Sequence, residues 1–245
     1  FEKEYRQWVP EYMFAEYKKG RTPNPDVVCN KYIKFGVWLD RAREMGFDYL
    51  ATGHYARLER AKSKVKSQKS KVLLLQAKDK DKDQTYFLHQ LNQDQLVHVL
   101  FPIGEYTKPQ VRVLARKFKL TTAEREESMG ICFVGEVPMK EFLQQRIKPK
   151  PGKIVLSSGE VIGEHEGLAF YTIGQRHFGI RNQESGIMGP LYVVNKDFKK
   201  NQLVVGDEND PFLFKKEITL SYIHWVSGQQ PRFPLKCEVR LRHRQ

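Results

Sequence analysis

The chain has 245 residues, of which 40% are apolar and 29% charged, a composition typical of a folded globular protein and unlike that of a fibrous or disordered one. Lysine and arginine number 42 against 29 acidic residues, and the resulting net charge of +13 indicates a polyanionic partner, either nucleic acid or an anionic membrane surface. Three dispersed cysteines exclude a secreted disulfide scaffold and favour a reducing, cytoplasmic location, and no apolar run is long enough to predict a membrane span.

The N-terminal part of the sequence predicts alternating helices and strands. Apolar spacing predicts a helix over the first 20 residues, and two prolines then exclude helix from the loop Gly20 to Asp26. Asp26 has the residue type of a helix cap, and the spacing from Val27 to Met45 predicts the next helix. The stretch from Phe47 to Tyr55 reads as a strand ending in a polar loop around Gly53. Ligands of α/β sheets bind beyond the carboxyl ends of such strands.

A lysine-rich tract at residues 61–71 is interpreted as a surface loop, with a phosphate-contacting arm as the alternative. A strand is expected at Val72 to Gln76, and helices are expected at Leu91 to Leu100 and at Pro109 to Phe118. These elements continue the helix and strand rhythm of an α/β domain.

The character of the sequence changes near residues 149–152, after which Gly and β-branched residues predominate. Short apolar runs separated by turn signals predict a β-rich module, with strands at residues 153–156, 160–163, 192–194 and 202–205. A further pair of strands is expected at Glu217 to Trp225 and at Leu235 to Leu241. The chain opens inside an amphipathic segment and stops in a charged one, so we expect it to be part of a longer protein.

Two of the three cysteines stand in sequences that could carry chemistry. Cys29 lies near the predicted start of a helix, where free N–H groups and the positive end of the helix dipole stabilise a thiolate. Cys132 lies in an apolar run between glycines, and Cys237 is interpreted as a packing residue. A small buried hydrophobe is the ordinary alternative for each, and no clustered ligands predict a metal site.

Basic and aromatic residues are interleaved at residues 167–180 and alternate again from Arg240 to Arg244. Such mixtures suit RNA, because cations meet phosphates and rings stack on bases, although a glycine-rich β module or a charge-guarded strand has the same appearance. His54, at the end of the predicted strand, could instead be an ordinary hydrogen-bonded surface histidine.

Six sequence motifs in order resemble the tRNA-specific 2-thiouridylase (MnmA) family. They are TPNPDVVCN from Thr22, IKFG from Ile33, ATGHY from Ala51, KDQTYFL from Lys82, GICFVG from Gly130 and TIGQR from Thr172. The resemblance implies an α/β fold with a PP-loop (adenine nucleotide α-hydrolase-like) domain at residues 1–148. A small β-rich central domain at 149–208 and the start of a truncated C-terminal β-barrel at 209–245 would follow.

The resemblance also implies ATP-dependent 2-thiolation of the wobble uridine of tRNA, in which ATP adenylates the C2 oxygen of the base. A persulfide on Cys132 would deliver sulfur, and Cys29 would attack that persulfide or close a disulfide with Cys132. Asp26 would be the acid or base, and Mg²⁺ and a persulfide donor, either a cysteine desulfurase or a sulfur-relay protein, are expected partners. The family pattern places Asn24, Pro25 and Asp26 at the target base and Gly53 at the nucleotide, and it assigns tRNA contacts to His54, Lys82, Asp83, Gln84, Arg242 and His243.

The sequence departs from the family pattern in places. No glycine- and serine-rich phosphate loop occurs in residues 1–245, so we expect these residues alone not to turn over. Glu127, Met129 and His243 replace the family's usual Asp, Thr and Tyr. Two alternatives therefore stay open, namely a non-catalytic tRNA-binding fragment and another PP-loop ATP pyrophosphatase.

Overall fold

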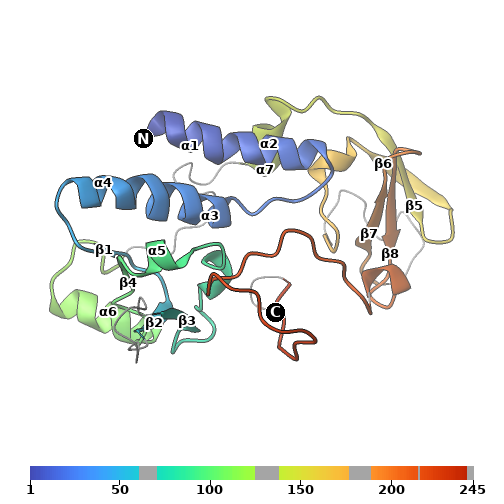
Figure 1. The fold of residues 1–245 in the computed structure, drawn as a ribbon. Coiled ribbons are helices and arrows are strands. Elements are labelled where there is room, and N and C mark those ends of the chain that lie inside the picture. The colour runs from blue at the N-terminus through green and yellow to red at the C-terminus, as the bar shows by residue number, and fades with distance from the viewer. Residues whose placement is uncertain (61–70, 125–137, 177–188, 215, 242–245) are drawn as a thin grey trace. The chain divides into compact units, whose positions relative to one another are not determined.

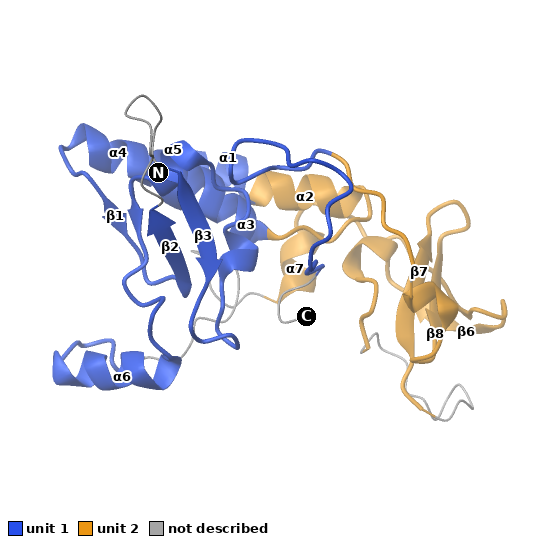
Figure 2. Ribbon diagram, turned by 60° about the horizontal axis from the view of Figure 1, so that its bottom comes forward, with its two compact units in different colours: residues 1–9, 25–135, 222–245 blue, residues 10–24, 136–221 orange. Residues whose placement is uncertain are grey.

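A computed structural model describes residues 1–60, 71–124, 138–176, 189–214 and 216–241. The chain divides into two compact units, each assembled from separate stretches of sequence (Figure 2). Unit 1 contains residues 1–9, 25–135 and 222–245, and unit 2 contains residues 10–24 and 136–221. The domain boundaries expected at residues 148 and 208 stay a prediction.

Helices make up the N-terminal part of unit 1 (Figure 1). Helix α1 (Glu2–Trp8) precedes a continuous helical run made of α3 (Pro25–Val28), the π-helical segment η1 (Cys29–Val37) and α4 (Trp38–Glu44). Trp8 stacks on Tyr32 of η1 with ring centroids 4.1 Å apart. The helix predicted over residues 27–45 is therefore confirmed, and it begins two residues earlier than expected.

Two small sheets complete the core of unit 1. Strand β1 (Leu50–Ala51) pairs in parallel with β4 (Val99–Leu100), and β2 (Ala56–Arg60) pairs antiparallel with β3 (Val72–Gln76). Their apolar side chains pack with the helical run in one buried cluster, formed by Phe35, Leu39, Ala56, Val72, Leu88, Leu91, Leu96 and Val99. This packing fixes the carboxyl end of β1 in relation to the helix that carries Cys29.

The expected helix at Leu91 to Leu100 is wrong for most of its length. After the short 3₁₀ turn η2 (Thr85–Phe87), only α5 (Gln93–Leu96) is helical, and residues 99–100 form β4. The side chain of Asn92 caps α5 by accepting from the backbone N–H of Gln95 at 2.9 Å. The buried Val99 belongs to the core as a strand residue, so tertiary packing overrides the helical spacing. Helix α6 (Lys108–Lys117) follows, close to its predicted position.

Residues 222–241, which we call the returning segment, belong to unit 1 and form no helix or strand within the described residues. The strands expected at 217–225 and 235–241 are therefore wrong. A strand needs a neighbour for its N–H and C=O groups, and no described strand of unit 1 pairs with this segment. Side chains hold it instead: Gln93 Nε2 donates to Val226 O at 2.8 Å, and His224 Nε2 lies 2.9 Å from Leu91 O.

Unit 2 combines two helices with a four-stranded sheet. The helices are α2 (Pro10–Lys18) and α7 (Met139–Gln144), and the rings of Phe14 and Phe142 stack between them at 5.0 Å. The sheet has the order β6-β5-β8-β7, with β5 (Gly152–Leu156), β6 (Val161–His165), β7 (Tyr192–Asp197) and β8 (Gln202–Gly206). The single-turn helix η3 (Leu168–Phe170) lies between β6 and β7 in sequence, and η4 (Pro211–Leu213) follows β8. These are the four strands predicted for the β-rich module, and the mixed α/β class is confirmed.

Candidate functional site

The predicted nucleophile and acid lie on consecutive turns of one helical run in unit 1. Asp26 stands in the first turn of α3, inside the helix, so its expected role as the cap is wrong. Cys29 is the first residue of the π-helical segment, is fully buried and forms no disulfide with a described residue. Burial raises the pKa of the Asp26 carboxyl, and the nearby Lys34 ammonium offsets part of that increase. Asp26 therefore holds a proton more readily than an ordinary carboxyl group does.

Asn30, next to Cys29, connects this helix to the loop that follows β1. Its amide Nδ2 donates to Phe87 O at 3.1 Å, so the Asn30 oxygen is left to accept from His54 Nε2 at 3.2 Å. His54 Nδ1 is then unprotonated and accepts from the Thr52 hydroxyl at 2.7 Å. The hydrogen bonds thus fix one neutral tautomer of the imidazole.

His54 is 8% exposed, and its ring packs against those of Phe35 and Phe101 at centroid distances of 5.5 and 5.8 Å. Burial, with a contribution from the Lys34 charge, lowers the pKa of His54 to about 3. Both ring nitrogens have protein partners, which leaves little of the side chain for RNA. The predicted tRNA contact of His54 stays a prediction.

Gly53 is exposed in the loop between Thr52 and His54, and a Cβ placed on it would meet nothing within 4 Å. Backbone is therefore open to a ligand at the carboxyl end of β1, where the sequence predicts the nucleotide. The residues present fit only this part of an ATP site, because no phosphate loop occurs in the sequence. No group of three or more His, Cys, Asp or Glu able to hold a metal ion is found in the part of the chain that the structure describes.

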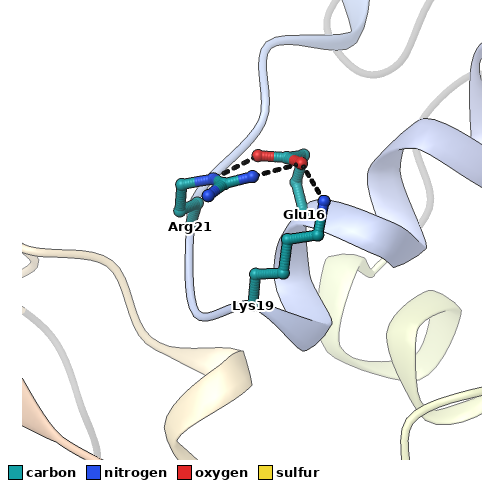
Figure 3. Close-up of polar contacts among 3 residues, drawn as sticks. All are labelled: Glu16, Lys19 and Arg21. Atoms are coloured by element: carbon teal, nitrogen blue, oxygen red, sulfur yellow. Dashed lines mark hydrogen bonds and ion pairs between the residues drawn. The ribbon is translucent and has the colours of Figure 1, made fainter. Parts of the chain in front are cut away.

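The chain that leads to the predicted base-contacting residues Asn24 and Pro25 is held by a charged cluster (Figure 3). Glu16 of α2 accepts two hydrogen bonds from Arg21, that from Nη2 at 2.6 Å, and one from Lys19 at 3.3 Å. Pairing with Arg21 lowers the pKa of Glu16. Beyond Arg21, the Thr22 hydroxyl lies 2.9 Å from that of Thr172, which brings together two sequence motifs 150 residues apart.

Of the predicted tRNA contacts Lys82, Asp83 and Gln84, the middle residue is buried. Asp83 is 2% exposed and accepts from Ala77 N at 2.9 Å, from the Thr85 hydroxyl at 2.6 Å and from Arg240 Nη1 at 2.9 Å. Gln84 Oε1 accepts from Tyr55 N at 2.9 Å. Asp83 and Gln84 thus organise the loop, and their tRNA contacts stay predictions.

Arg240 lines a pocket of about 420 Å³ together with Gln76, Thr85, Tyr86, His89 and Leu241. Sequence reasoning did not single out this pocket, nor the roles of Asn30 and Thr52. Tyr86, Asn30 and Thr52 all stand inside the motifs that carried the family resemblance, so their place in those motifs could have identified them as candidate functional residues.

Three predicted site residues lie outside the described residues: Cys132, Arg242 and His243. The structure does not support the disulfide between Cys29 and Cys132, since it shows none, and the disulfide stays a prediction. Cys237 is exposed, so its expected packing role is wrong.

Comparison with known proteins decides the family. Residues 1–136 match the family model described as the tRNA methyl transferase HUP domain, and residues 140–207 match the tRNA methyl transferase PRC-barrel domain. The chain belongs to this family. The expected PP-loop fold, followed by a barrel-like domain, is thereby confirmed.

Relatives of the chain carry the name tRNA-specific 2-thiouridylase MnmA. Those of Streptococcus sanguinis, Streptococcus agalactiae serotype III and Legionella pneumophila are 45%, 47% and 44% identical to it, each over 100% of this chain. The chain spans about 65% of the length of the first two and 66% of the third. In the described part of the chain no helix is long and apolar enough to cross a membrane.

Proposed function

We propose that the full-length protein is an ATP-dependent tRNA-uridine 2-sulfurtransferase that thiolates the wobble uridine. The observation that carries the proposal is the 44–47% identity, over the whole of this chain, to relatives named tRNA-specific 2-thiouridylase. The net charge of +13 supports a polyanionic substrate. A cytoplasmic location belongs to the same proposal.

Within the proposed reaction, Cys29 supplies the thiol and Asp26 moves the proton. About one helical turn separates them, so the two residues lie on the same side of the run. The raised pKa of Asp26 suits a carboxyl that exchanges protons nearer neutral pH. Asn24 and Pro25 would bind the target base in its extruded position.

The remaining parts of the reaction involve groups outside the described residues. ATP, with Mg²⁺, would supply the adenylyl group that turns the C2 oxygen into a leaving group. Cys132 would carry the sulfur as a persulfide received from a cysteine desulfurase or a sulfur-relay protein. Cys29 would attack that persulfide or pair with Cys132 after the transfer.

A cysteine substitution in the full-length protein tests the proposal. We expect Cys29→Ser to abolish 2-thiouridine in tRNA, measured by mass spectrometry of nucleosides from a complemented deletion strain, while tRNA affinity stays unchanged. Cys237→Ser is the matched control, because Cys237 is exposed, and it should thiolate normally. Full thiolation by Cys29→Ser would refute the role of Cys29, and a deletion strain that keeps its 2-thiouridine would refute the function.

A further inference from the structure

The pocket beside Arg240, which we call the Tyr86 pocket, lies entirely within unit 1. Its volume is about 420 Å³, within the usual range for small-ligand sites. Thr85, Tyr86 and His89 come from η2 and the turn after it, Gln76 ends β3, and Arg240 and Leu241 come from the returning segment. The pocket therefore depends on two stretches of chain about 155 residues apart in sequence, joined by the bond from Tyr86 OH to Leu241 O at 3.1 Å.

The aromatic side of the pocket is held in place by hydrogen bonds. His89 Nδ1 donates to Tyr86 O at 2.7 Å, which leaves Nε2 of the neutral imidazole as an acceptor. The rings of Tyr86 and His89 are 6.2 Å apart and inclined at 55°. Two ring faces with fixed positions suit a planar ligand.

The polar side is the guanidinium of Arg240. Its side chain is 29% exposed, and it is anchored through Nη1 by Asp83, whose side chain is 1% exposed. Asp83 is itself fixed by Ala77 N and the Thr85 hydroxyl. Because Asp83 already balances the charge of Arg240, a bare anion would gain little there. The guanidinium instead offers oriented N–H donors and a flat face.

We propose that the Tyr86 pocket binds one nucleobase of single-stranded RNA, stacked on Tyr86 or His89 and hydrogen-bonded by Arg240. Aromatic rings with arginine are the ordinary means of holding unpaired bases, and the net charge of +13 favours RNA over a neutral peptide. The inference rests on the proposed function, since it takes the RNA to be tRNA. It adds a site for a second nucleotide, apart from the target uridine.

Ring and hydroxyl substitutions of Tyr86 in the full-length protein test the pocket. We expect Tyr86→Leu to weaken binding of a synthetic anticodon stem-loop by about 5- to 150-fold, the range measured for loss of one stacked base. Tyr86→Phe keeps the ring and should retain most of the affinity. Tyr106→Leu is the matched control, because Tyr106 is an exposed aromatic residue of unit 1 outside the pocket. Thermal unfolding establishes that each variant is folded.

Abasic stem-loops, each lacking one loop base, identify the occupant. The stem-loop that lacks the occupying base should bind the wild type more weakly, and Tyr86→Leu should not weaken its binding further. For a stem-loop lacking any other loop base, Tyr86→Leu should weaken binding as much as it does for the intact stem-loop. Equal losses at all positions, or no loss with a folded Tyr86→Leu variant, would overturn the pocket proposal. So would a pocket that accepts a proline-rich or acidic peptide in preference to the stem-loop.

The two proposals fail in different ways. The stem-loop measurement needs neither ATP nor sulfur. If the effect of Tyr86→Leu does not depend on which base is missing, the pocket proposal is refuted, while thiolation by the wild type is unaffected. A protein that binds the stem-loop through Tyr86 but leaves 2-thiouridine unchanged on deletion removes the proposed function and keeps the pocket.

Discussion

A single neutral imidazole connects the helix of Cys29 with the loop of Gly53. Asn30 and Thr52 fix His54 in one tautomer, and the phenylalanines around it exclude water. If the imidazole were charged, Nδ1 would have to donate to the Thr52 hydroxyl instead of accepting from it. The buried charge would also cost free energy unless another group compensated it. The low pKa of His54 follows from this arrangement.

The stability of unit 1 should therefore depend on His54 and pH. The folded pKa is lowered to about 3 from 6.5, so between these values the unfolded state binds the proton and stability falls as pH falls. From pH 8 to pH 5 we expect His54 to account for about 2 kcal/mol of lost unfolding free energy. Urea titrations at both pH values measure the loss, and His54→Gln should show a smaller one. Equal losses in the two proteins would contradict the burial of a neutral His54.

At the scale of residues, the sequence predicts the local position of a residue better than its contacts with distant residues. Asp26 and Cys29 could be placed near a helix start because proline, a cap-type residue and apolar spacing are local signals. The bond from His54 to Asn30 could not, because the two residues are 24 positions apart and only the packing of the helical run against β1 brings their side chains together. His54 was consequently assigned to the surface, and it is buried.

At the scale of elements, a close backbone approach holds the turn after β4 against β2. A Cβ added to Gly104 would lie 1.8 Å from Ala56 O, and the Gly104 carbonyl accepts from Lys78 N at 2.9 Å. Glycine is required there because any side chain would push this turn away from the buried start of β2.

Substitution by alanine should therefore destabilise the protein at Gly104 and have little effect on its stability at Gly53. Gly104→Ala should lower the free energy of unfolding by about 1–3 kcal/mol or more, as overpacking does, because Ala56 O cannot move without breaking β2. Gly53→Ala, which meets nothing within 4 Å, should stay within about 0.5 kcal/mol of the wild type. Urea midpoints decide between them, and a stable Gly104→Ala would show that the turn is not packed as described. A loss of ATP affinity in Gly53→Ala would then belong to the site.

Strands were predicted well where a sheet stands alone and poorly where pairing is distant. The four strands of unit 2 are separated by turn signals, and each alternates or runs apolar, so local pattern suffices. Strand β1 lies inside the strand predicted at Phe47 to Tyr55, but β4 has only two residues and lies where a helix is predicted. The two strands pair although Leu50 and Val99 are 49 positions apart, and no local pattern reveals that pairing. The returning segment has alternating residues without a partner strand, so its pattern misled the prediction.

For the whole molecule, charge sets the behaviour toward RNA. Because these 245 residues carry a net charge of +13, the full-length protein should bind tRNA mainly through phosphates. We expect affinity to fall by about a thousandfold between 50 and 200 mM salt, measured by filter binding, if six or more phosphates are contacted. In a plot of the logarithm of affinity against the logarithm of salt concentration, Tyr86→Leu should lower the affinity at every salt concentration without changing the slope, because it removes no charge. A fall of less than tenfold would contradict phosphate-dominated binding.

The order in which the chain is made also matters, because unit 1 takes residues from both the beginning of the described chain and residues 222–241. Domains usually fold as they leave the ribosome, N-terminal parts first. Here Arg240 reaches Asp83 only once residue 240 has been synthesised, so the buried carboxylate has no cation while residues 136–221 of unit 2 are translated. Unit 2 can therefore acquire its sheet before the translation of unit 1 is complete, and a ribosome that stalls after residue 221 would leave Asp83 buried without its counter-ion.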